Sequence, residues 1–470
     1  MKIILYTCPN TMSKILGKGA AFVTKQEPLG LLYIASYLKK YNYDVSITDA
    51  FSFGLSGEDI IEEISKEKPD VIGFSVLTSG GKIALDLTKL IKKKFPEILI
   101  VLGNIHPSIF AEHYLKNKSA DIIVHDEGEV TFSEIVIKFN QKNKWNDIKG
   151  ISFIDDAGKF VTTEKREVLE NLDEIPVPAR ELIPINQYRM QFYFHPYANT
   201  QYYKMIMTSR GCPYKCSFCT VHKSGKIRYH SVERVRDELK ILLDGYNSKF
   251  IFFMDSLFMS SRKRVLDICN MINENKFKFD WGCEGRVNLA EPSLLKEMKK
   301  AGCYEIAYGI ESGVQELLNN INKNCTIEQI ESAVKYTKEA GIKVMGLFIL
   351  GLPGEEKKLS YQTIKFAKRL NLDIAQFSIC TPYPGSELYN NLINEKKIDP
   401  FDWEKYSQYA NFTDNEPIWT PEKITGSEIK KIVMNAYIQF YFRPKIIFKL
   451  LKNIRINNLL EYVKAAKTFF

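Results

Sequence analysis

The sequence predicts an α/β protein with a doubly wound parallel sheet, a partial barrel and a helical C-terminal extension. Short β-rich runs alternate with helical patterns in two stretches, 1–145 and 201–390, and each stretch predicts one sheet. A basic, amphipathic stretch closes the chain and predicts that the extension, 391–470, is helical. The length of 470 residues agrees with this division, because about 150 residues per domain is the usual prior.

Five short apolar runs mark the strands of the first unit. They cover residues 2–7, 44–50, 70–76, 98–104 and 121–128, with helical patterns between them. The helix after the third run has a predicted apolar face made of Ile83, Leu87, Leu90 and Ile91. Such alternation predicts a flavodoxin-like sheet of parallel strands, and ligands of such sheets bind beyond the carboxyl ends of the strands.

Residues 146–200 have a different pattern and predict a linker. They begin with a predicted hairpin that turns at residues 156–158. The segment PVPARELIP follows, and its prolines discourage regular structure.

Six further strand candidates predict the second unit. They cover residues 203–209, 250–256, 279–284, 304–312, 344–351 and 373–379, and helical patterns follow most of them. One helix carries its own boundary residues, because Thr326 and Gln329 form a capping box and Gly341 ends the pattern. Six such units predict a partial (βα)6 barrel with its active site at the carboxyl ends of the strands.

Composition excludes some classes of protein. With 45% hydrophobic and 26% charged residues, the chain is not a disordered protein. The net charge of +9 is mild, and no nucleic-acid-binding motif accompanies it, so no nucleic-acid partner is expected. We expect a cytoplasmic protein, because neither a signal peptide nor a membrane-spanning run is present and the 9 cysteines include a closely spaced group.

That group carries the clearest chemical motif. Cys212, Cys216 and Cys219 form a C-x3-C-x2-C pattern directly after the first barrel strand. Three thiolates on one loop can bind three irons of a [4Fe–4S] cluster and leave the fourth iron open. The alternative is a structural zinc site, with His222 as the fourth ligand.

The motifs of this sequence resemble those of radical S-adenosylmethionine enzymes that carry a cobalamin-binding domain. In the second unit the resemblance rests on the cysteine loop, the six βα units and the GIES and GLPGE segments. In the first unit it rests on the segments EPLGLLYIASYL, GNIHPS and HDEGEVTF. The resemblance covers about residues 1–445.

The resemblance implies that the three cysteines hold a [4Fe–4S] cluster whose open iron chelates S-adenosylmethionine. Phe218 is then expected to contact the adenine. Glu311 is expected to accept hydrogen bonds from the ribose hydroxyls, and Gly309 leaves room beside it.

Further strand ends complete the implied S-adenosylmethionine site. Gly351, Pro353 and Gly354 would let the backbone approach the adenosine closely. Asp255 is expected to bind the methionine ammonium, although the usual glycine-rich form of that motif is absent. Arg286 is expected to pair with the methionine carboxylate.

For the first unit the resemblance implies a cobalamin site at the strand-end loops. The matching residues are Leu29, Gly30, Ser75, Thr78, Gly103, His106, Glu127 and Gly128. The common D-x-H-x-x-G signature is absent around every histidine, so cobalamin is expected base-off, without a protein histidine on cobalt. The alternative is a degenerate domain that holds no ligand.

The implied function is methyl transfer to an unactivated carbon, by way of a 5′-deoxyadenosyl radical and methylcobalamin. Two alternatives remain at this stage: a radical oxidative cyclase or rearrangement enzyme without methyl transfer, and a non-catalytic cobalamin-binding sensor. The expected partners are a small-molecule or lipid-like substrate and a flavodoxin- or ferredoxin-type reductant. For the basic C-terminal tail we expect a helical cap on the barrel, with peripheral contact to anionic lipid as the alternative.

Overall fold

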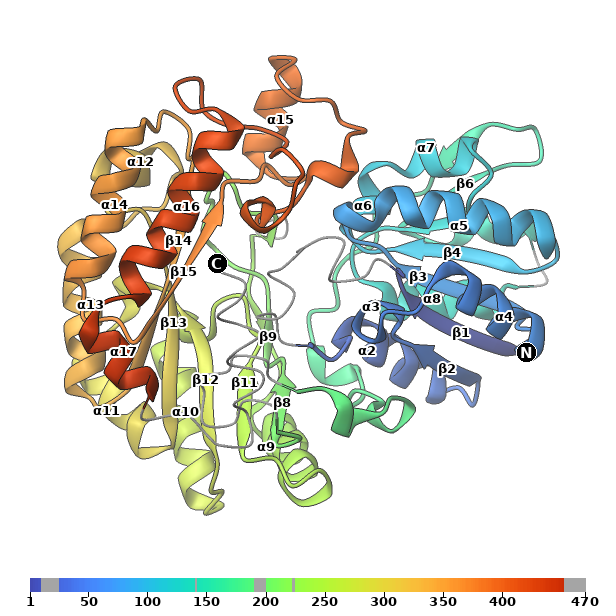
Figure 1. Cartoon of the computed structure of the whole chain (residues 1–470). Helices are drawn as coiled ribbons and strands as arrows, with labels where there is room; N and C mark the ends of the chain where they lie inside the picture. The colour runs from blue at the N-terminus through green and yellow to red at the C-terminus, as the bar shows by residue number, and fades with distance from the viewer. Residues whose placement is uncertain (10–24, 140–141, 190–199, 222–224, 452–470) are drawn as a thin grey trace. The chain divides into compact units, whose positions relative to one another are not determined.

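The computed structural model describes residues 1–9, 25–139, 142–189, 200–221 and 225–451 (Figure 1). It divides into two compact units, which we describe separately. The first unit comprises Met1–Ile15, Glu27–Ile185 and Asp399–Tyr406. The second comprises Leu16–Gln26, Asn186–Ile398 and Ser407–Phe470.

The first unit is built on a sheet of seven strands in the order β2-β1-β3-β4-β5-β6-β7. The strands are β1 (Lys2–Thr7), β2 (Asp44–Thr48), β3 (Val71–Ser75), β4 (Leu99–Gly103), β5 (Ile122–Val124), β6 (Ile151–Ile154) and β7 (Phe160–Thr162). The first five strands are parallel, which confirms the five predicted strands and the doubly wound arrangement. The chain changes direction along the sheet between β1 and β3, where such folds bind ligands.

Helices connect these strands. They are α2 (Leu29–Lys39), α3 (Ala50–Phe53), α4 (Gly57–Glu67), α5 (Gly81–Lys94), α6 (Ile105–Ile109), α7 (Ala111–Lys116) and α8 (Gly128–Ile137). In α5, Leu87 and Ile91 are buried as expected, but Leu90 is exposed. Thr88 is buried in its place and donates its hydroxyl hydrogen bond to the Ala84 carbonyl within the helix.

The segment expected to be a linker belongs largely to the first unit. The hairpin is present, but β6 pairs antiparallel with β5, so the hairpin extends the sheet. Beyond it, the Arg180 guanidinium donates to the Glu27 carboxylate at 2.9 Å, and both side chains are 1% exposed. The first unit therefore continues to Ile185 instead of ending near residue 145.

The second unit is built on six parallel strands that follow one another in chain order, β8-β11-β12-β13-β14-β15. They are β8 (Tyr203–Ile206), β11 (Phe250–Phe253), β12 (Asp280–Gly285), β13 (Cys303–Glu311), β14 (Lys343–Leu350) and β15 (Ile374–Ile379). A separate ribbon pairs β9 (Ser209–Arg210) with β10 (Arg228–Tyr229). All six predicted barrel strands are confirmed.

Helices follow the barrel strands, and all of them except α15 share one apolar core with the strands. They are α9 (Val232–Lys240), α10 (Arg262–Glu274), α11 (Pro292–Lys300), α12 (Gln315–Asn320), α13 (Ile327–Glu339), α14 (Lys357–Arg369) and α15 (Glu387–Asn394). The Thr326–Gln329 capping box begins α13 as predicted, and Gly341 adopts a positive φ of 76° just beyond its end.

The C-terminal extension covers the last strand. Helix α16 (Gly426–Tyr441) packs against β15, and α17 (Pro444–Leu451) follows it. The Tyr437 hydroxyl accepts from the Phe377 backbone N–H at 3.2 Å and donates to the Phe377 carbonyl at 3.0 Å. Tyr441 bonds Ala375 in the same way, so two side chains satisfy the free edge of the sheet.

The helical cap predicted for the tail is thus confirmed for α16, whereas residues 452–470 lie outside the described residues. Within the described ranges, no helix combines the length and the apolar character that crossing a membrane would require.

Candidate functional site

The cysteine loop begins where β9 ends, and a buried carboxylate fixes its entry. Asp255 follows β11 and accepts hydrogen bonds from the Thr208 backbone N–H at 2.5 Å, the Thr208 hydroxyl at 2.5 Å and the Ser209 N–H at 2.9 Å. Asp255 was expected to bind the methionine ammonium, which stays a prediction; the structure adds that its oxygens hold the start of the loop.

The three cysteines then follow on a loop that the barrel anchors at its middle. The Cys219 N–H donates to the Cys216 carbonyl at 3.0 Å. Ser217 between them donates its N–H to the Ile321 carbonyl and accepts at its own carbonyl from the Leu388 N–H. Phe218, the expected adenine contact, is half-buried on the same turn.

The three thiols differ in exposure, and Cys212 and Cys216 are close enough to affect the pKa of Cys219. Cys216 is buried, whereas Cys212 and Cys219 are partly exposed. Burial raises the pKa of the Cys219 thiol, and the neighbouring Cys216 and Cys212 raise it further. Among the described residues, no three His, Cys, Asp or Glu side chains converge closely enough to hold a single metal ion. The zinc alternative also required His222, which lies outside the described residues.

Arg286 lies directly beside the loop. Its Nη1 donates to the Cys216 sulfur at 3.6 Å, and its guanidinium lies 3.6 Å from the centre of the Tyr214 ring. Its Nε and Nη2 are buried and have no hydrogen-bond partner in the described structure. Two adjacent unpaired N–H donors suit a carboxylate, which a guanidinium binds through two parallel hydrogen bonds.

Glu311 ends β13 in a left-handed conformation with φ of 64°, at an irregularity in the pairing with β14. Its carboxylate is held by the Lys323 ammonium at 2.5 Å. A Cβ at Gly309 would lie 2.6 Å from the Glu311 carboxylate and 2.8 Å from Lys323 Nζ, so the glycine is required there. Lys323 was not foreseen, because it lies on a connection with no motif of its own.

The turn after β14 is also held by a side chain that the sequence analysis did not assign. Glu355 accepts the backbone N–H groups of Gly351 and Leu352 at 2.9 Å and 2.8 Å. Gly351 and Gly354 have positive φ values of 82° and 80°, as the turn requires. Burial raises the pKa of Glu355 to about 7, while these hydrogen bonds oppose the rise.

Glu284 is a second unforeseen carboxyl group. It lies on β12 between Cys283 and Gly285, and the alternation of the strand turns Cys283 into the core and Glu284 to the other face. Its side chain is accessible, yet surrounding protein raises the pKa to about 7 by desolvation, and the nearby Glu311 raises it further. We find no hydrogen bond from this carboxyl group to any described residue.

The donor set around the loop fits a [4Fe–4S] cluster with S-adenosylmethionine. Three thiols from one loop match the ligands of such a cluster. The unpaired nitrogens of Arg286 fit the methionine carboxylate, and the Glu311 carboxylate fits hydroxyl groups of a ribose.

The residues expected to contact cobalamin follow strand ends of the first unit. Leu29 and Gly30 open α2, Ser75 ends β3, and Gly103 ends β4. Glu127 and Gly128 open α8, and Thr78 lies on the short 3-10 helix η2 (Thr78–Gly80). These positions lie at one edge of the sheet, because the carboxyl ends of parallel strands share an edge.

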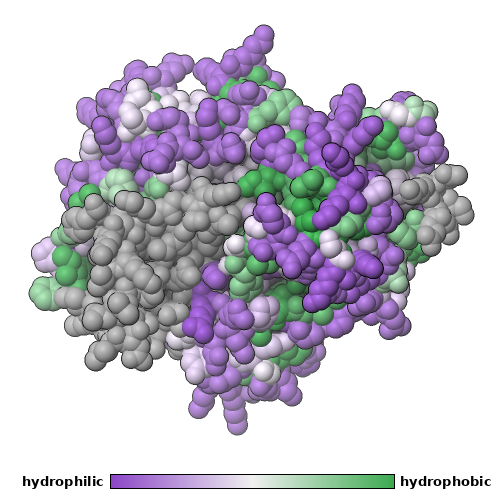
Figure 2. Space-filling view, turned by 45° about the vertical axis from the view of Figure 1, so that its right-hand side comes forward, coloured by the Kyte–Doolittle hydropathy of each residue, from purple (hydrophilic) through white to green (hydrophobic). Residues whose placement is uncertain are grey.

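This edge suits a flat apolar ligand. Leu77 beyond β3 is exposed, and a Cβ at Gly30 would meet no atom within 4 Å. The face of the molecule in Figure 2 is mostly hydrophilic and carries a few separate hydrophobic patches. Small residues and an exposed leucine at the strand ends fit the corrin of cobalamin.

His106 differs from the other residues of this set, because it is fully buried. Burial lowers the pKa of its imidazole to about 3, so the ring is neutral. The Trp403 ring covers it at a centroid distance of 4.6 Å. His106 follows β4, as expected of a residue on a strand-end loop, but its side chain is not accessible to a ligand in this structure.

Comparisons with known proteins give one match in each unit. Residues 18–136 match the B12 binding domain, and residues 206–367 match the Radical SAM superfamily. An uncharacterized methyltransferase of Pyrococcus horikoshii is 35% identical over 454 residues, which cover 96% of this chain and 94% of that one. The anaerobic magnesium-protoporphyrin IX monomethyl ester cyclase of Rubrivivax gelatinosus is 30% identical over 446 residues, covering 93% and 77%.

A solved structure shows the same fold. The cobalamin-dependent S-adenosylmethionine radical enzyme OxsB, with aqua-cobalamin and S-adenosylmethionine bound, superposes with a TM-score of 0.66 at 22% identity. The match covers 93% of this chain and 61% of that one.

Proposed function

The chain belongs to the radical S-adenosylmethionine superfamily, in the branch that carries a B12 binding domain, and from this premise we propose that it is a methyltransferase acting at an unactivated carbon. Its cofactors are a [4Fe–4S] cluster, S-adenosylmethionine and cobalamin. Similarity to a methyltransferase along almost the whole chain supports the reaction type.

The three cofactors together suit this chemistry. An unactivated carbon has no lone pair to attack a methyl cation donor, so a radical must first be made there. When bound, the cluster supplies the electron that cleaves S-adenosylmethionine to a 5′-deoxyadenosyl radical, and cobalamin supplies the methyl group. The protein has to position these groups and exclude water.

The observation that carries the proposal for the barrel is the contact between Arg286 and Cys216. It places two unpaired guanidinium nitrogens beside the cysteine loop, where they would bind the methionine carboxylate. Glu311 would accept from the ribose hydroxyls, and Gly309 leaves the space it needs. Gly351 would let the backbone meet the adenosine, in a turn that Glu355 holds.

In the first unit, we propose that cobalamin lies on the strand-end edge. Ser75, Gly103 and Gly128 would contact it through the loops that follow β3, β4 and β5. For Asp255 we propose a role in holding the cysteine loop in addition to the expected contact with the methionine ammonium, and for His106 a role beneath Trp403 in the first unit.

A radical oxidative cyclase is the second candidate, and the 30% identity to a protoporphyrin ester cyclase supports it. The two candidates differ in what they do with S-adenosylmethionine. A cobalamin-dependent methyltransferase consumes it both as a methyl source, giving S-adenosylhomocysteine, and as a radical source, giving 5′-deoxyadenosine. A cyclase needs only the second use.

The test needs no knowledge of the substrate. The full chain is purified anaerobically and reconstituted with iron, sulfide and hydroxocobalamin, and dithionite and S-adenosylmethionine are then added. We expect cluster and corrinoid absorption, 5′-deoxyadenosine, and S-adenosylhomocysteine that depends on added cobalamin. Formation of 5′-deoxyadenosine without S-adenosylhomocysteine would favour the cyclase, and absence of corrinoid binding would overturn the methyltransferase.

Two cysteine variants control this test. Cys216→Ala is expected to abolish cluster absorption and both products. Cys283→Ala should keep them, because Cys283 lies in the apolar core and burial raises its thiol pKa well above the ordinary value.

The substrate class, the reductant, the cellular compartment and the contact with lipid are also proposals. We propose a small-molecule substrate and a flavodoxin- or ferredoxin-type reductant in a reducing cytoplasm, and the 9 cysteines, all free thiols, support that compartment. Contact of the tail with anionic lipid draws support from two exposed aromatic residues, Phe442 just after α16 and Phe448 on α17. Flotation of the full chain and a 1–441 truncation, which keeps α16 on the barrel, with anionic vesicles tests it, and equal non-binding would remove it.

A further inference from the structure

A short segment from the C-terminal half of the chain completes the first unit. Residues 399–406, which we call the strap, are separated in sequence from the rest of that unit by the whole barrel. The strap carries the 3-10 helix η11 (Trp403–Lys405), which packs against η2 and α5. These elements follow β3, so the strap reaches the strand-end edge at its centre.

Trp403 is the anchor of the strap. It is 2% exposed, and its indole N–H donates to the Pro400 carbonyl at 2.8 Å. Its ring lies at centroid distances of 4.6 Å from His106 and 5.1 Å from Phe110. It also stacks on Tyr114 with an interplanar angle of 3°. A buried aromatic residue with this many ring contacts contributes more than its apolar area alone.

His106, beneath Trp403, joins two strand-end loops. His106 lies in the first turn of α6, just after β4. Its ring lies against the start of α5, where a Cβ at Gly81 would be 2.2 Å from the His106 Nε2. Both ring nitrogens are buried and have no hydrogen-bond partner in the described structure. Since such a ring gains nothing from polar contacts, its position depends on the aromatic side chains that enclose it.

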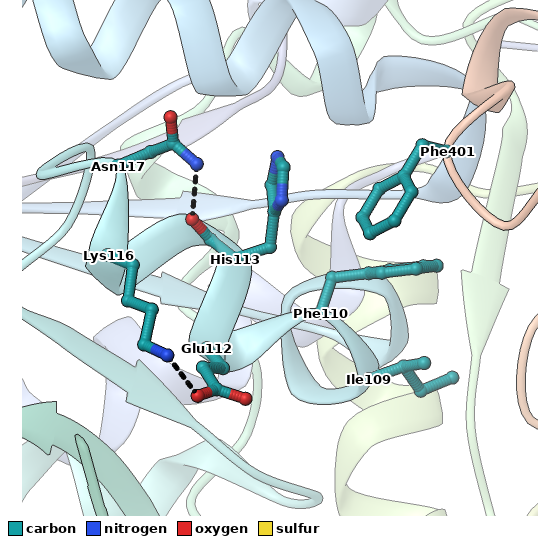
Figure 3. Close-up of a pocket in the computed structure, with 7 residues that line it drawn as sticks. All are labelled: Ile109, Phe110, Glu112, His113, Lys116, Asn117 and Phe401. Carbon is teal, nitrogen blue, oxygen red and sulfur yellow. Dashed lines mark hydrogen bonds and ion pairs between the residues drawn. The ribbon is translucent and has the colours of Figure 1, made fainter.

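The strap also has an exposed aromatic residue, Phe401. Phe401 is 53% exposed and, with Phe110, lines a surface cavity of about 420 Å³ along α6 and α7 (Figure 3). The charged groups of this cavity are paired with one another, as Lys116 is with Glu112 at 2.6 Å. Phe401 contacts the Phe110 and Trp403 rings at centroid distances of 5.8 Å and 5.9 Å, but the described contacts include none between Phe401 and the His106 ring, so Phe401 serves as a matched control.

We propose that Trp403 is a positioning residue for cobalamin, which acts by holding His106 and thereby the loops after β3 and β4 at the strand-end edge. The cobalamin-binding unit is then discontinuous, and residues 1–185 bind cobalamin poorly without the strap. This inference rests on the proposed cobalamin-dependent function. Trp403 is 2% exposed and packs against η2 and α5, so in this proposal it acts through these elements and His106 and not by touching cobalamin.

The test compares Trp403→Ala, Trp403→Phe and Phe401→Ala in the full chain. Hydroxocobalamin affinity is measured by titrating the visible spectrum and by the rise in melting temperature that cobalamin produces. Iron content and 5′-deoxyadenosine formation are measured in the same preparations. If Trp403→Ala leaves the loops correctly placed for a tenth of the time, the apparent Kd rises about tenfold. We expect Trp403→Phe to restore most of the affinity and Phe401→Ala to leave it unchanged.

Each other result overturns the inference. Wild-type affinity in Trp403→Ala would show that the strap does not position the loops. Parallel loss of iron and cobalamin would show a general structural defect. An equal loss of cobalamin affinity in Phe401→Ala would show that any aromatic residue of the strap has this effect and that Trp403 has no specific role. If the wild-type chain itself binds no cobalamin, the proposed function fails as well, which distinguishes the two failures.

Discussion

Lys323 donates a hydrogen bond to Glu311 at 2.5 Å, and each side chain is 7% exposed. The pair joins the end of β13 to the connection before α13, next to the cysteine loop. Burial lowers the pKa of the Lys323 ammonium, but the Glu311 carboxylate and the Cys216 thiol together outweigh this effect, so the pKa is raised overall. The lysine therefore stays charged, and it neutralises a carboxylate that lies in a left-handed backbone conformation.

Lys323→Met is expected to destabilise the barrel strongly. Removing one partner of a buried ion pair typically costs about 3–5 kcal/mol, because the remaining charge is left without compensation. The measurement is the denaturant midpoint of the apo protein. Lys300→Met is the control, because its pair with Glu297 is exposed and such pairs contribute under about 1 kcal/mol. The double variant Glu311→Gln with Lys323→Met should recover part of the loss, and failure to do so would contradict the ion-pair explanation.

Asp255→Asn tests which role the buried carboxylate has. If Asp255 holds the loop, the loss of an acceptor for Thr208 or Ser209 costs about 1–3 kcal/mol and lowers the iron content. The measurement is iron per chain together with the melting temperature, and the exposed Asp267→Asn provides the control. Full iron content with weakened S-adenosylmethionine binding would instead support the ammonium role implied by the family resemblance.

We expect the affinity for S-adenosylmethionine to depend on pH because of Glu284. Its raised pKa of about 7 means that the carboxyl group is neutral below pH 7 and charged above it. A cationic ligand binds the charged form better, so binding should tighten as the pH rises from 6 to 8. If the bound cation lowers this pKa by one unit, the affinity improves about fivefold over that range.

The pH dependence should disappear in Glu284→Gln. The control is Glu291→Gln, which changes an exposed carboxyl group and should keep the pH dependence. The measurement is the S-adenosylmethionine concentration for half-maximal 5′-deoxyadenosine formation at each pH. An unchanged pH profile in Glu284→Gln would place the titrating group elsewhere.

Gly81→Ala is expected to disturb the first unit, since the new methyl group would lie 2.2 Å from the His106 ring. Overpacking of this kind typically costs about 1–3 kcal/mol. The measurement is the melting temperature, with Gly30→Ala as the control because a Cβ there meets nothing. If Gly81→Ala melts like the wild type, then His106 is not fixed against α5 as described.

Local sequence patterns were sufficient to predict the regular elements. Alternating apolar runs located the barrel strands, and the Thr326–Gln329 box located the start of α13, because each depends on residues within one strand or one helical turn. The spacing of Cys212, Cys216 and Cys219 is likewise local, so the resemblance could be drawn from it. Leu90 shows where the pattern fails: it fits the apolar spacing of α5 but is exposed, because the packing of the helix on its sheet sets which face is buried.

Local patterns along the chain were thus enough to predict the two sheets, their order and the residue types at the strand ends. Packing between separate elements sets the surroundings of these side chains: Asp255 accepts hydrogen bonds from Thr208, Glu284 is exposed, and Glu311 is paired with Lys323. It also brought Trp403 onto His106 across almost 300 positions of the chain. The physical reason is that backbone hydrogen bonding repeats along the chain, whereas contacts between distant side chains arise only when separate elements pack.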